Sequence, residues 1–362
     1  MKPDIAIAGG GLAGAAAACR LARAGQRVLV LERFAGPHHK VCGEFISGEA
    51  EQALEDLGLS GILGRLGAIA VERVRLVAGQ REVVAALPFR AFGLSRYRLD
   101  ACLLDHAERL GAIVRRGVPV RSIAPEGAGI RLTGAGEPIR VAAAMLATGK
   151  HDLRGCGRTT PPSTLIGLKL HLRLDASAAR SLAGHVELAL FPGGYAGLQA
   201  IEDGRANACL VVEKKRFAQL GRDWRRLVAS VPHLERRLAG ASTCTSAPIA
   251  VYRIPYGHLH RGGDDAPIYR LGDQLAVIHS FTGDGMAMAL RSAECAAAAV
   301  LAGKPATAYH ADIARAFGPA VRLAGAVAQL AAVAPLQAPL VAACCVAPTL
   351  VTSLAAWTRA AA

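Results

Sequence analysis

Apolar residues near the start of the chain form two short runs that predict buried strands. Ile5-Ala-Ile-Ala8 ends at the glycine-rich stretch 9–14, and the small residues of 15–24 are typical of a helix. A second apolar run, Val28-Leu-Val-Leu31, ends at Glu32. Strand, glycine turn, helix, strand and acidic residue in this order predict a βαβ unit that binds a dinucleotide.

Each glycine of this unit has a physical task. Gly9 permits the tight turn, Gly11 lets the backbone approach a pyrophosphate, and Gly14 lets the helix pack closely on the strand. The helix N-terminus favours the phosphate charge. Glu32 is placed to bind ribose hydroxyls, so a 2′-phosphate is disfavoured even beside Arg33. FAD and NAD both satisfy this half of the pattern.

A second glycine-rich helix start lies far downstream and favours flavin. The strand-like run 268–271 leads into Gly272-Asp273, and Ser280-Phe-Thr-Gly-Asp-Gly285 precedes a predicted helix over 286–301. Asp273 is suited to bind ribityl hydroxyls, and the N–H groups around Gly283 and Gly285 are suited to stabilise negative charge on reduced flavin. The two motifs together predict FAD.

Between the two motifs the pattern changes to that of strands. Leu168-Lys-Leu-His-Leu-Arg-Leu174 alternates, which predicts a half-buried strand whose Lys169, His171 and Arg173 form a solvated face. Further strands are expected with turns at Pro-Gly-Gly and Asp203-Gly204, over residues 186–191, 195–201 and 207–212. An antiparallel sheet is therefore inserted between the motifs, as the wall and roof of a substrate cavity.

After Pro305 the chain is helical and unusually apolar. No charged residue occurs over 324–358, but Pro335, Pro339 and Pro348 interrupt this stretch. A membrane-spanning helix needs about twenty continuous apolar residues. We therefore expect packed helices that close the cavity, with peripheral membrane contact as the alternative.

Composition limits the classes of function. The 362 residues suffice for two or three lobes, and 52% of them are hydrophobic. The net charge of +14 is spread along the chain without interleaved aromatics, so we expect anionic ligands, an acyl carrier or an acidic lipid face as partners, and no nucleic acid. The nine scattered cysteines include no CxxC pair, which predicts reduced thiols, no metal site and a cytoplasmic, possibly membrane-peripheral, location. No leader peptide is expected at the start.

Several motifs resemble a known superfamily. GGGLAG with Glu32, and GDQLAVIHSFTGDG, are similar to FAD-dependent hydroxylases and reductases with the p-hydroxybenzoate hydroxylase fold. Lys40-Val-Cys-Gly-Glu44 with Ser47, and Phe191-Pro-Gly-Gly-Tyr195-Ala-Gly197, resemble the geranylgeranyl reductase branch. The segment 95–104 resembles the start of the second crossover of the FAD domain, and the resemblance covers most of residues 1–300.

Two positions depart from the family pattern. Ser280 stands where the second motif usually carries proline, which changes the expected shape of the flavin edge. Ala147-Thr148-Gly149 stands where hydroxylases usually show an Asp-Gly pair linked to nicotinamide handling. The second departure weakens the transfer of the hydroxylase NADPH mechanism to this chain.

The resemblance and the patterns together predict an α/β (α+β) fold. It comprises a Rossmann-like FAD-binding domain, an inserted antiparallel-sheet substrate domain and C-terminal helices. The expected FAD-binding domain is discontinuous, over 1–75, 96–160 and 265–304. The substrate domain is expected over 76–95 and 161–264, and the helical segment over 305–362.

The same resemblance supplies candidate site residues. Cys42 is similar to the cysteine that family reductases place near the isoalloxazine, where it donates a proton or controls substrate approach; a buried hydrophobic role is the alternative. His279 and Tyr195 are further catalytic candidates, with structural roles as their alternatives. The expected FAD-binding residues are Gly9, Gly11, Gly14, Glu32, Arg33, Arg96, Val120, Asp273, Gly283, Asp284, Gly285 and Met286.

Three functions remain open at this point. The first is an FAD oxidoreductase that reduces C=C bonds of an apolar isoprenoid or related lipid by flavin hydride transfer. The second is a monooxygenase that hydroxylates an aromatic or polyketide substrate through a C4a-hydroperoxyflavin. The third is a non-catalytic flavin sensor. NAD(P)H is the expected electron donor of the enzymes, and a ferredoxin is the alternative.

Overall fold

The N-terminal strands belong to a five-stranded parallel sheet. The computed structural model describes residues 3–134, 136–161, 163–263 and 266–359, so the last three residues of the predicted C-terminal segment lie outside it. The sheet order is β17-β10-β1-β2-β6, formed by β17 (Ile268–Arg270), β10 (Ala143–Leu146), β1 (Ile5–Ala8), β2 (Val28–Glu32) and β6 (Ile113–Arg116). The predicted βαβ unit and the return of a distant segment to it are both confirmed.

Helices and a small sheet cover the two faces of the parallel sheet. On one face lie α1 (Leu12–Arg23), α4 (Arg96–Arg109) and α9 (Gly285–Leu301), and the small buried residues 15–18 of α1 let these helices approach closely. On the other face lies the three-stranded sheet of β7 (Val120–Glu126), β8 (Gly129–Gly134) and β9 (Ile139–Val141). The short helices α2 (Gly48–Asp56) and α3 (Ile62–Arg65) pack into the same hydrophobic core as α1, α4 and α9.

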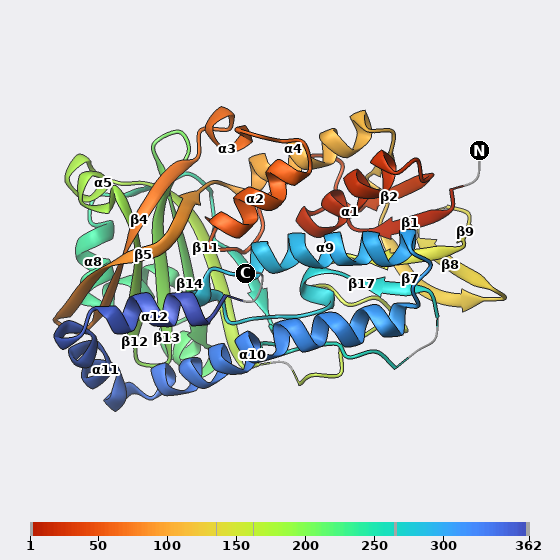
Figure 1. The fold of residues 1–362 in the computed structure, drawn as a ribbon. Coiled ribbons are helices and arrows are strands. Elements are labelled where there is room, and N and C mark those ends of the chain that lie inside the picture. Colours follow the sequence, from red (N-terminus) through yellow and green to blue (C-terminus); the bar gives the residue numbers. More distant parts are fainter. Residues whose placement is uncertain (1–2, 135, 162, 264–265, 360–362) are drawn as a thin grey trace.

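A second, nine-stranded sheet forms the other lobe (Figure 1). The predicted meander is confirmed as three consecutive antiparallel strands, and a single parallel pair joins it to the earlier hairpin of β4 and β5. The strands are β3 (Phe45–Ser47), β4 (Ile69–Ala78), β5 (Arg81–Gly93), β11 (Leu165–Arg173), β12 (Gly184–Phe191), β13 (Gly194–Ile201), β14 (Arg205–Glu213), β15 (Ser242–Thr243) and β16 (Ile249–Tyr252).

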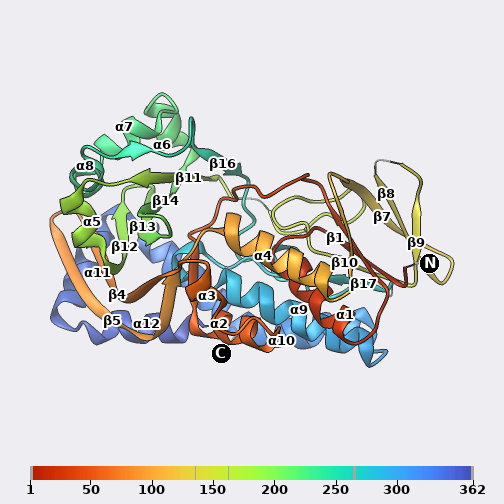
Figure 2. The same cartoon turned by 90° about the horizontal axis from the view of Figure 1, so that it is seen from above.

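Small helices cover one face of this sheet, on the side away from the C-terminal helices (Figure 2). Leu182, Phe217, Leu227 and Leu234 contribute their side chains to its core. They come from α5 (Ala176–Leu182), α6 (Lys214–Gln219), α7 (Trp224–Ala229) and α8 (Pro232–Leu238).

The solvated face predicted for β11 is wrong at two of its three positions. Lys169 and His171 are buried, with 1% and 2% exposure, whereas Arg173 is exposed. Alternating polarity indicates two different environments, and here the polar side faces the segment 40–45 instead of water. Glu44 of that segment supplies a buried carboxylate for both polar side chains.

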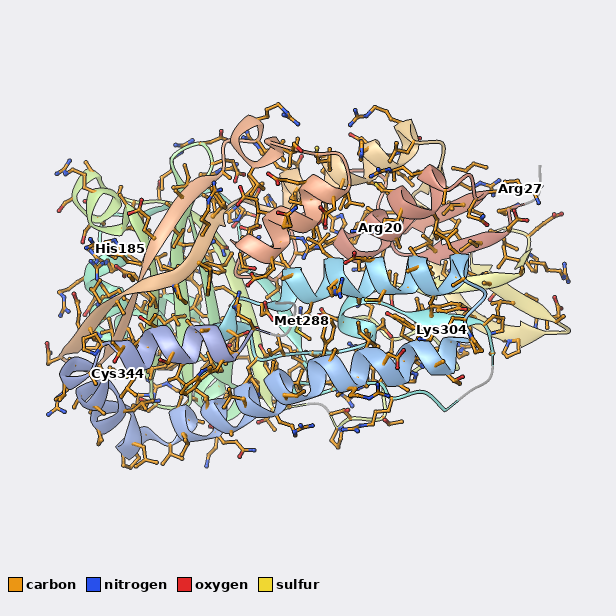
Figure 3. All side chains as sticks on the ribbon, in the orientation of Figure 1. Arg20, Arg27, His185, Met288, Lys304 and Cys344 are labelled. Atoms are coloured by element: carbon orange, nitrogen blue, oxygen red, sulfur yellow. The ribbon has the colours of Figure 1, made fainter. Side chains whose placement is uncertain are left out.

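The C-terminal segment forms α10 (Ala306–Ala332), α11 (Ala334–Val346) and α12 (Thr349–Trp357). α10 runs beside α9, and α11 and α12 pack on β4 and β5 of the large sheet (Figures 1 and 2). Cys344 of α11, labelled in Figure 3, belongs to this contact and is buried. Within the described ranges no single helix has the length and apolarity to cross a membrane; α10 and α11 pass that test only as a pair, bent by 111°.

Candidate functional site

The first glycine turn requires glycine at two positions. Gly9 has φ of +106°, and a Cβ there would overlap the backbone of Ala147. A Cβ at Gly14 would overlap the carbonyl of Gly9, because α1 starts directly against the end of β1. These contacts agree with the turn and packing tasks expected from the sequence.

Two cations stand over the third glycine. A Cβ at Gly11 would lie 2.8 Å from Lys40 Nζ and 3.6 Å from Arg96 Nη2. Both cations bind Asp100, with Lys40 Nζ 2.7 Å and Arg96 Nε 2.6 Å from its oxygens. Burial by itself would raise the pKa of Asp100, but Arg96 and Lys40 lower it to about 2. A bare glycine at a helix N-terminus beneath Lys40 and Arg96 fits a pyrophosphate.

The ribose acid is buried at the end of β2. Glu32 accepts hydrogen bonds from the backbone N–H of Gly10, at 2.7 Å, and of Phe34, at 3.0 Å. These bonds orient a carboxylate beside the glycine turn, as binding of a ribose requires. Arg33 points elsewhere, with Nη2 2.8 Å from His151 Nε2, and Val120 is the half-buried first residue of β7.

The second motif brings an acid and a helix start to the same end of the sheet. Asp273 lies in a 3₁₀ turn, Gly272–Gln274, where Lys150 Nζ is 3.0 Å from its carboxylate. Burial opposes ionisation of Asp273, but Lys150 offsets burial and holds the pKa of Asp273 below its usual value. A carboxylate held ionised in this way is a strong acceptor for ribityl hydroxyls.

The turn before α9 also requires glycine. Gly283 has φ of +69°, and a Cβ there would lie 2.7 Å from Phe45 Cδ1. Asp284 is buried and lies 3.3 Å from Arg359 Nη1, Gly285 is the first residue of α9, and Met286 is buried. The start of α9 is therefore packed against the segment that carries Cys42.

Cys42 lies in a segment whose backbone carbonyls accept hydrogen bonds from side chains of the large sheet. Asn207 Nδ2 donates to the carbonyl oxygens of Cys42, at 3.1 Å, and Gly43, at 2.8 Å. Gln199 Nε2 donates to the carbonyl of Glu44 at 2.7 Å. Cys42 also interacts electrostatically with Arg96, one of the two cations over Gly11. The large sheet thus positions the Cys42 thiol beside the dinucleotide site.

Glu44 is the centre of a buried charged network. Its carboxylate pairs with Lys169, lies 2.7 Å from His171 Nε2 and accepts the backbone N–H of Arg96 at 2.8 Å. Because an ionised carboxylate only accepts, His171 donates to it. Burial by itself would raise the pKa of Glu44, but His171 and Lys169 lower it. Glu44 adopts φ of +59°, which is uncommon for a residue with a side chain.

The remaining catalytic candidates belong to an aromatic group above the second motif. His279 stacks on Tyr256, with ring centroids 4.4 Å apart, and burial lowers the pKa of His279 to about 4. Tyr256 Oη lies 2.7 Å from Ser280 Oγ. The Tyr195 hydroxyl is buried and interacts with Tyr256 and Ser280. Tyr195, Tyr256 and Ser280 therefore form one polar group beside the second motif.

Sequence reasoning missed several side chains of the site, Lys40 over Gly11 and Tyr256 beside His279 among them. Lys150 holds Asp273, Lys169 and His171 hold Glu44, and Arg359 reaches the second motif from beyond α12. The alternation over 168–174 correctly set Lys169 and His171 on one polar side of the strand, but that side was expected to face water. Lys150 and Arg359 carry no local signal, because their partners are more than seventy residues away in the chain.

The comparisons with known proteins agree with this arrangement. Residues 2–143 match the family described as FAD binding domain. Menaquinone reductase of Mycobacterium tuberculosis is 27% identical over 313 residues, which cover 81% of this chain and 75% of that protein. Squalene monooxygenase 1,2 of Brassica napus is 36% identical over 86 residues, only 24% of this chain and 17% of that protein.

Solved structures share the fold. The flavin-dependent brominase Bmp2 superposes with a TM-score of 0.79 at 18% identity, covering 99% of this chain and 94% of that chain. The halogenase PltM gives 0.76 at 17% identity, covering 92% and 78%. At this identity the likeness concerns the fold.

The glycine turns, the buried Glu32 and the matched family together define a flavoprotein. Residues 2–143 match the FAD-binding domain family, and the chain shares its fold with a flavin-dependent brominase. The protein is an FAD-dependent oxidoreductase, which sets aside the non-catalytic sensor.

Proposed function

We propose that this oxidoreductase reduces C=C bonds in an isoprenoid or related apolar lipid. The observation that carries the proposal is the position of Cys42, whose backbone the large sheet fixes and whose side chain interacts with Arg96, one of the two cations over Gly11. We assign this thiol the role of proton donor beside a bound flavin. The similarity to menaquinone reductase over most of the chain supports the same reading.

The chain's own residues bind and orient the cofactor. Lys40, Arg96 and the start of α1 would hold the pyrophosphate, Glu32 would accept from the ribose, and Asp273 would accept from the ribityl chain. FAD, when bound, supplies a hydride equivalent to the substrate carbon.

Proton delivery completes the reduction. The Cys42 thiol would donate a proton to one carbon of the double bond as the hydride adds to the other, so that the double bond gains two hydrogens and no free carbanion forms. Solvent then returns the proton to sulfur. Tyr195 and Tyr256 line the substrate side, where burial raises the pKa of both phenols and keeps them neutral. NAD(P)H is the proposed source of the electrons.

Hydroxylation is the second candidate function. The local similarity to squalene monooxygenase favours it, since its percentage identity is higher than that of the menaquinone reductase match. It also acts through FAD, but it consumes oxygen. Strict anaerobiosis therefore separates the two candidates.

The variant Cys42→Ala tests the proposed proton donor, with Cys244→Ala, whose thiol is exposed, as the matched control. Both proteins are expected to bind FAD, and NADPH is expected to bleach the flavin bands of both under nitrogen. Reduction of a menaquinone or geranylgeranyl lipid should fall by about 10²–10⁴-fold only in Cys42→Ala, the range for a lost general acid. Equal reduction rates in the two variants would remove Cys42 from the mechanism.

A further inference from the structure

The C-terminal helices present an apolar surface to solvent. Residues 324–358 include no charged side chain, and Val346 and Trp357 are 88% and 65% exposed. This C-terminal apolar surface is formed by Leu330, Val333, Leu336, Val346, Leu350 and Trp357. The end of α10, with α11 and α12, lies along one side of the molecule in both views (Figures 1 and 2). We propose that this surface docks onto an anionic phospholipid bilayer.

The helices α11 and α12 have a second apolar side, which faces the large sheet. Val341, Cys344 and Val351 are buried against the large sheet, where Val74 and Val83 belong to the same cluster. Thr352 Oγ1 also donates to the carbonyl of Ala86 at 3.1 Å. The helices are therefore anchored by their inner side, and their outer side is left as a large apolar patch of the kind that marks a binding surface.

A basic cavity lies next to the apolar surface. Arg261, Arg315 and Arg322 line a cavity of about 370 Å³ at α10. Arg315 and Arg322 are seven residues apart, so they project from the same side of the helix. Arg322 precedes Leu330 by eight residues, or about 12 Å along the helix axis. Phosphate groups beside acyl chains present the complementary arrangement.

Charge decides between a bilayer and a second copy of the chain. Each chain carries a net charge of +14. A symmetric dimer through this surface would bring two such charges, and both sets of cavity arginines, toward one another. Anionic lipid instead attracts them, at about 1 kcal/mol for each basic residue near the surface.

The helices that carry the apolar surface cover the same face of the large sheet as the Cys42 segment. Directly paired residues point to the same face of a sheet. One such row of paired residues crosses the sheet from β11 to β5. It begins at Lys169, which contacts Glu44, and ends at Val83, which packs against α11 and α12. The residues between them are, in order, Cys209, Gly197, Leu188 and Leu76. If the proposed function holds, docking would bring an apolar substrate to the side of the sheet that carries the Cys42 segment; the docking itself does not depend on that function.

The two tryptophans of the chain allow a direct test. Trp224→Phe leaves Trp357 as the only tryptophan, and its emission is expected to shift to the blue with phosphatidylglycerol vesicles. The protein should sediment with these vesicles and much less with phosphatidylcholine. Val346→Glu and Leu336→Glu should each weaken sedimentation by about tenfold, since each removes an apolar side chain and adds a charge. Ile113→Glu, on the edge strand β6, is the matched control and should bind as the parent does.

Three results would overturn the proposal. The first is that the parent protein does not sediment with phosphatidylglycerol vesicles. The second is that Val346→Glu and Ile113→Glu sediment equally. The third is that the protein forms a dimer without lipid and that Val346→Glu converts this dimer to monomer. The last result would assign the surface to a second copy. Lipid reduction measured in detergent micelles tests the proposed function separately, because no bilayer is then required.

Discussion

The carboxylate of Glu44 lies 2.7 Å from Nε2 of His171 and joins the Cys42 segment to the large sheet. Lys169 pairs with the same carboxylate, and all three side chains are at most 2% exposed. A buried ion pair adds little net stability when intact, but loss of one partner leaves an uncompensated charge. The network therefore fixes the place of the Cys42 thiol relative to the dinucleotide site.

Glu44→Gln should destabilise the protein by about 3 kcal/mol, because Lys169 is then buried without an opposite charge. Urea unfolding measures this loss. Glu44→Gln with Lys169→Met should recover part of it, and Glu55→Gln, at an exposed position of α2, is the control. Similar unfolding midpoints for Glu44→Gln and Glu55→Gln would contradict the role given to this network.

A second buried carboxylate predicts acid sensitivity. Burial would raise the pKa of Glu187, but His233 and Arg237 lower it from 4.5 to about 2, with further help from Arg75. A carboxyl whose pKa is lower in the folded state contributes stability above its unfolded pKa and loses it as the pH falls through the folded value. The stability difference between the wild type and Glu187→Gln should therefore shrink from pH 4.5 toward pH 2. A difference independent of pH across that range would refute the shift.

Substitutions in the first glycine turn should affect folding at one position and FAD binding at another. Gly14→Ala should prevent stable folding of the FAD domain, because its Cβ would overlap the carbonyl of Gly9. Gly11→Ala meets only the flexible end of Lys40, so it should fold but bind FAD about tenfold more weakly or worse. Gly36→Ala, in open space, is the control. Thermal unfolding and FAD titration are the measurements, and FAD affinity of Gly11→Ala equal to that of Gly36→Ala would argue against the pyrophosphate site.

The pKa of His279 near 4 predicts that it does not titrate in the working range. Its imidazole is neutral at pH 5–8, so His279→Gln should leave the shape of the pH–rate profile there unchanged. The profile is measured as lipid reduction under nitrogen. A step near pH 6.5 that disappears in His279→Gln would instead make this histidine the titrating acid.

The sequence was most informative where one short segment carries a whole physical task. The turn at Gly9 and Gly14, the acid Glu32 and the second helix start at Gly285 are local patterns, and the structure has each of them. The meander strands were equally predictable, because their alternation and turns are local. The flavin interpretation followed from two such motifs considered together.

The parts that were not predictable depend on distant partners. The alternation in β11 correctly indicated a strand, but water and a buried carboxylate give the same pattern of polar positions. Only the fold brings Glu44 to Lys169, 125 residues away, and Arg359 to the turn before α9. The exposure of the apolar C-terminal helices likewise depends on which of their sides the large sheet covers.

The mass of the product formed under nitrogen tests the central claim most directly. FAD-loaded protein, NADPH and a lipid with isoprenoid double bonds should give a product that has gained two hydrogens and no oxygen. The same product should form at the same rate in air, without oxygen uptake linked to it. A product that forms only in air, gains one oxygen atom and consumes oxygen in equal amount would contradict the reductase and establish the monooxygenase.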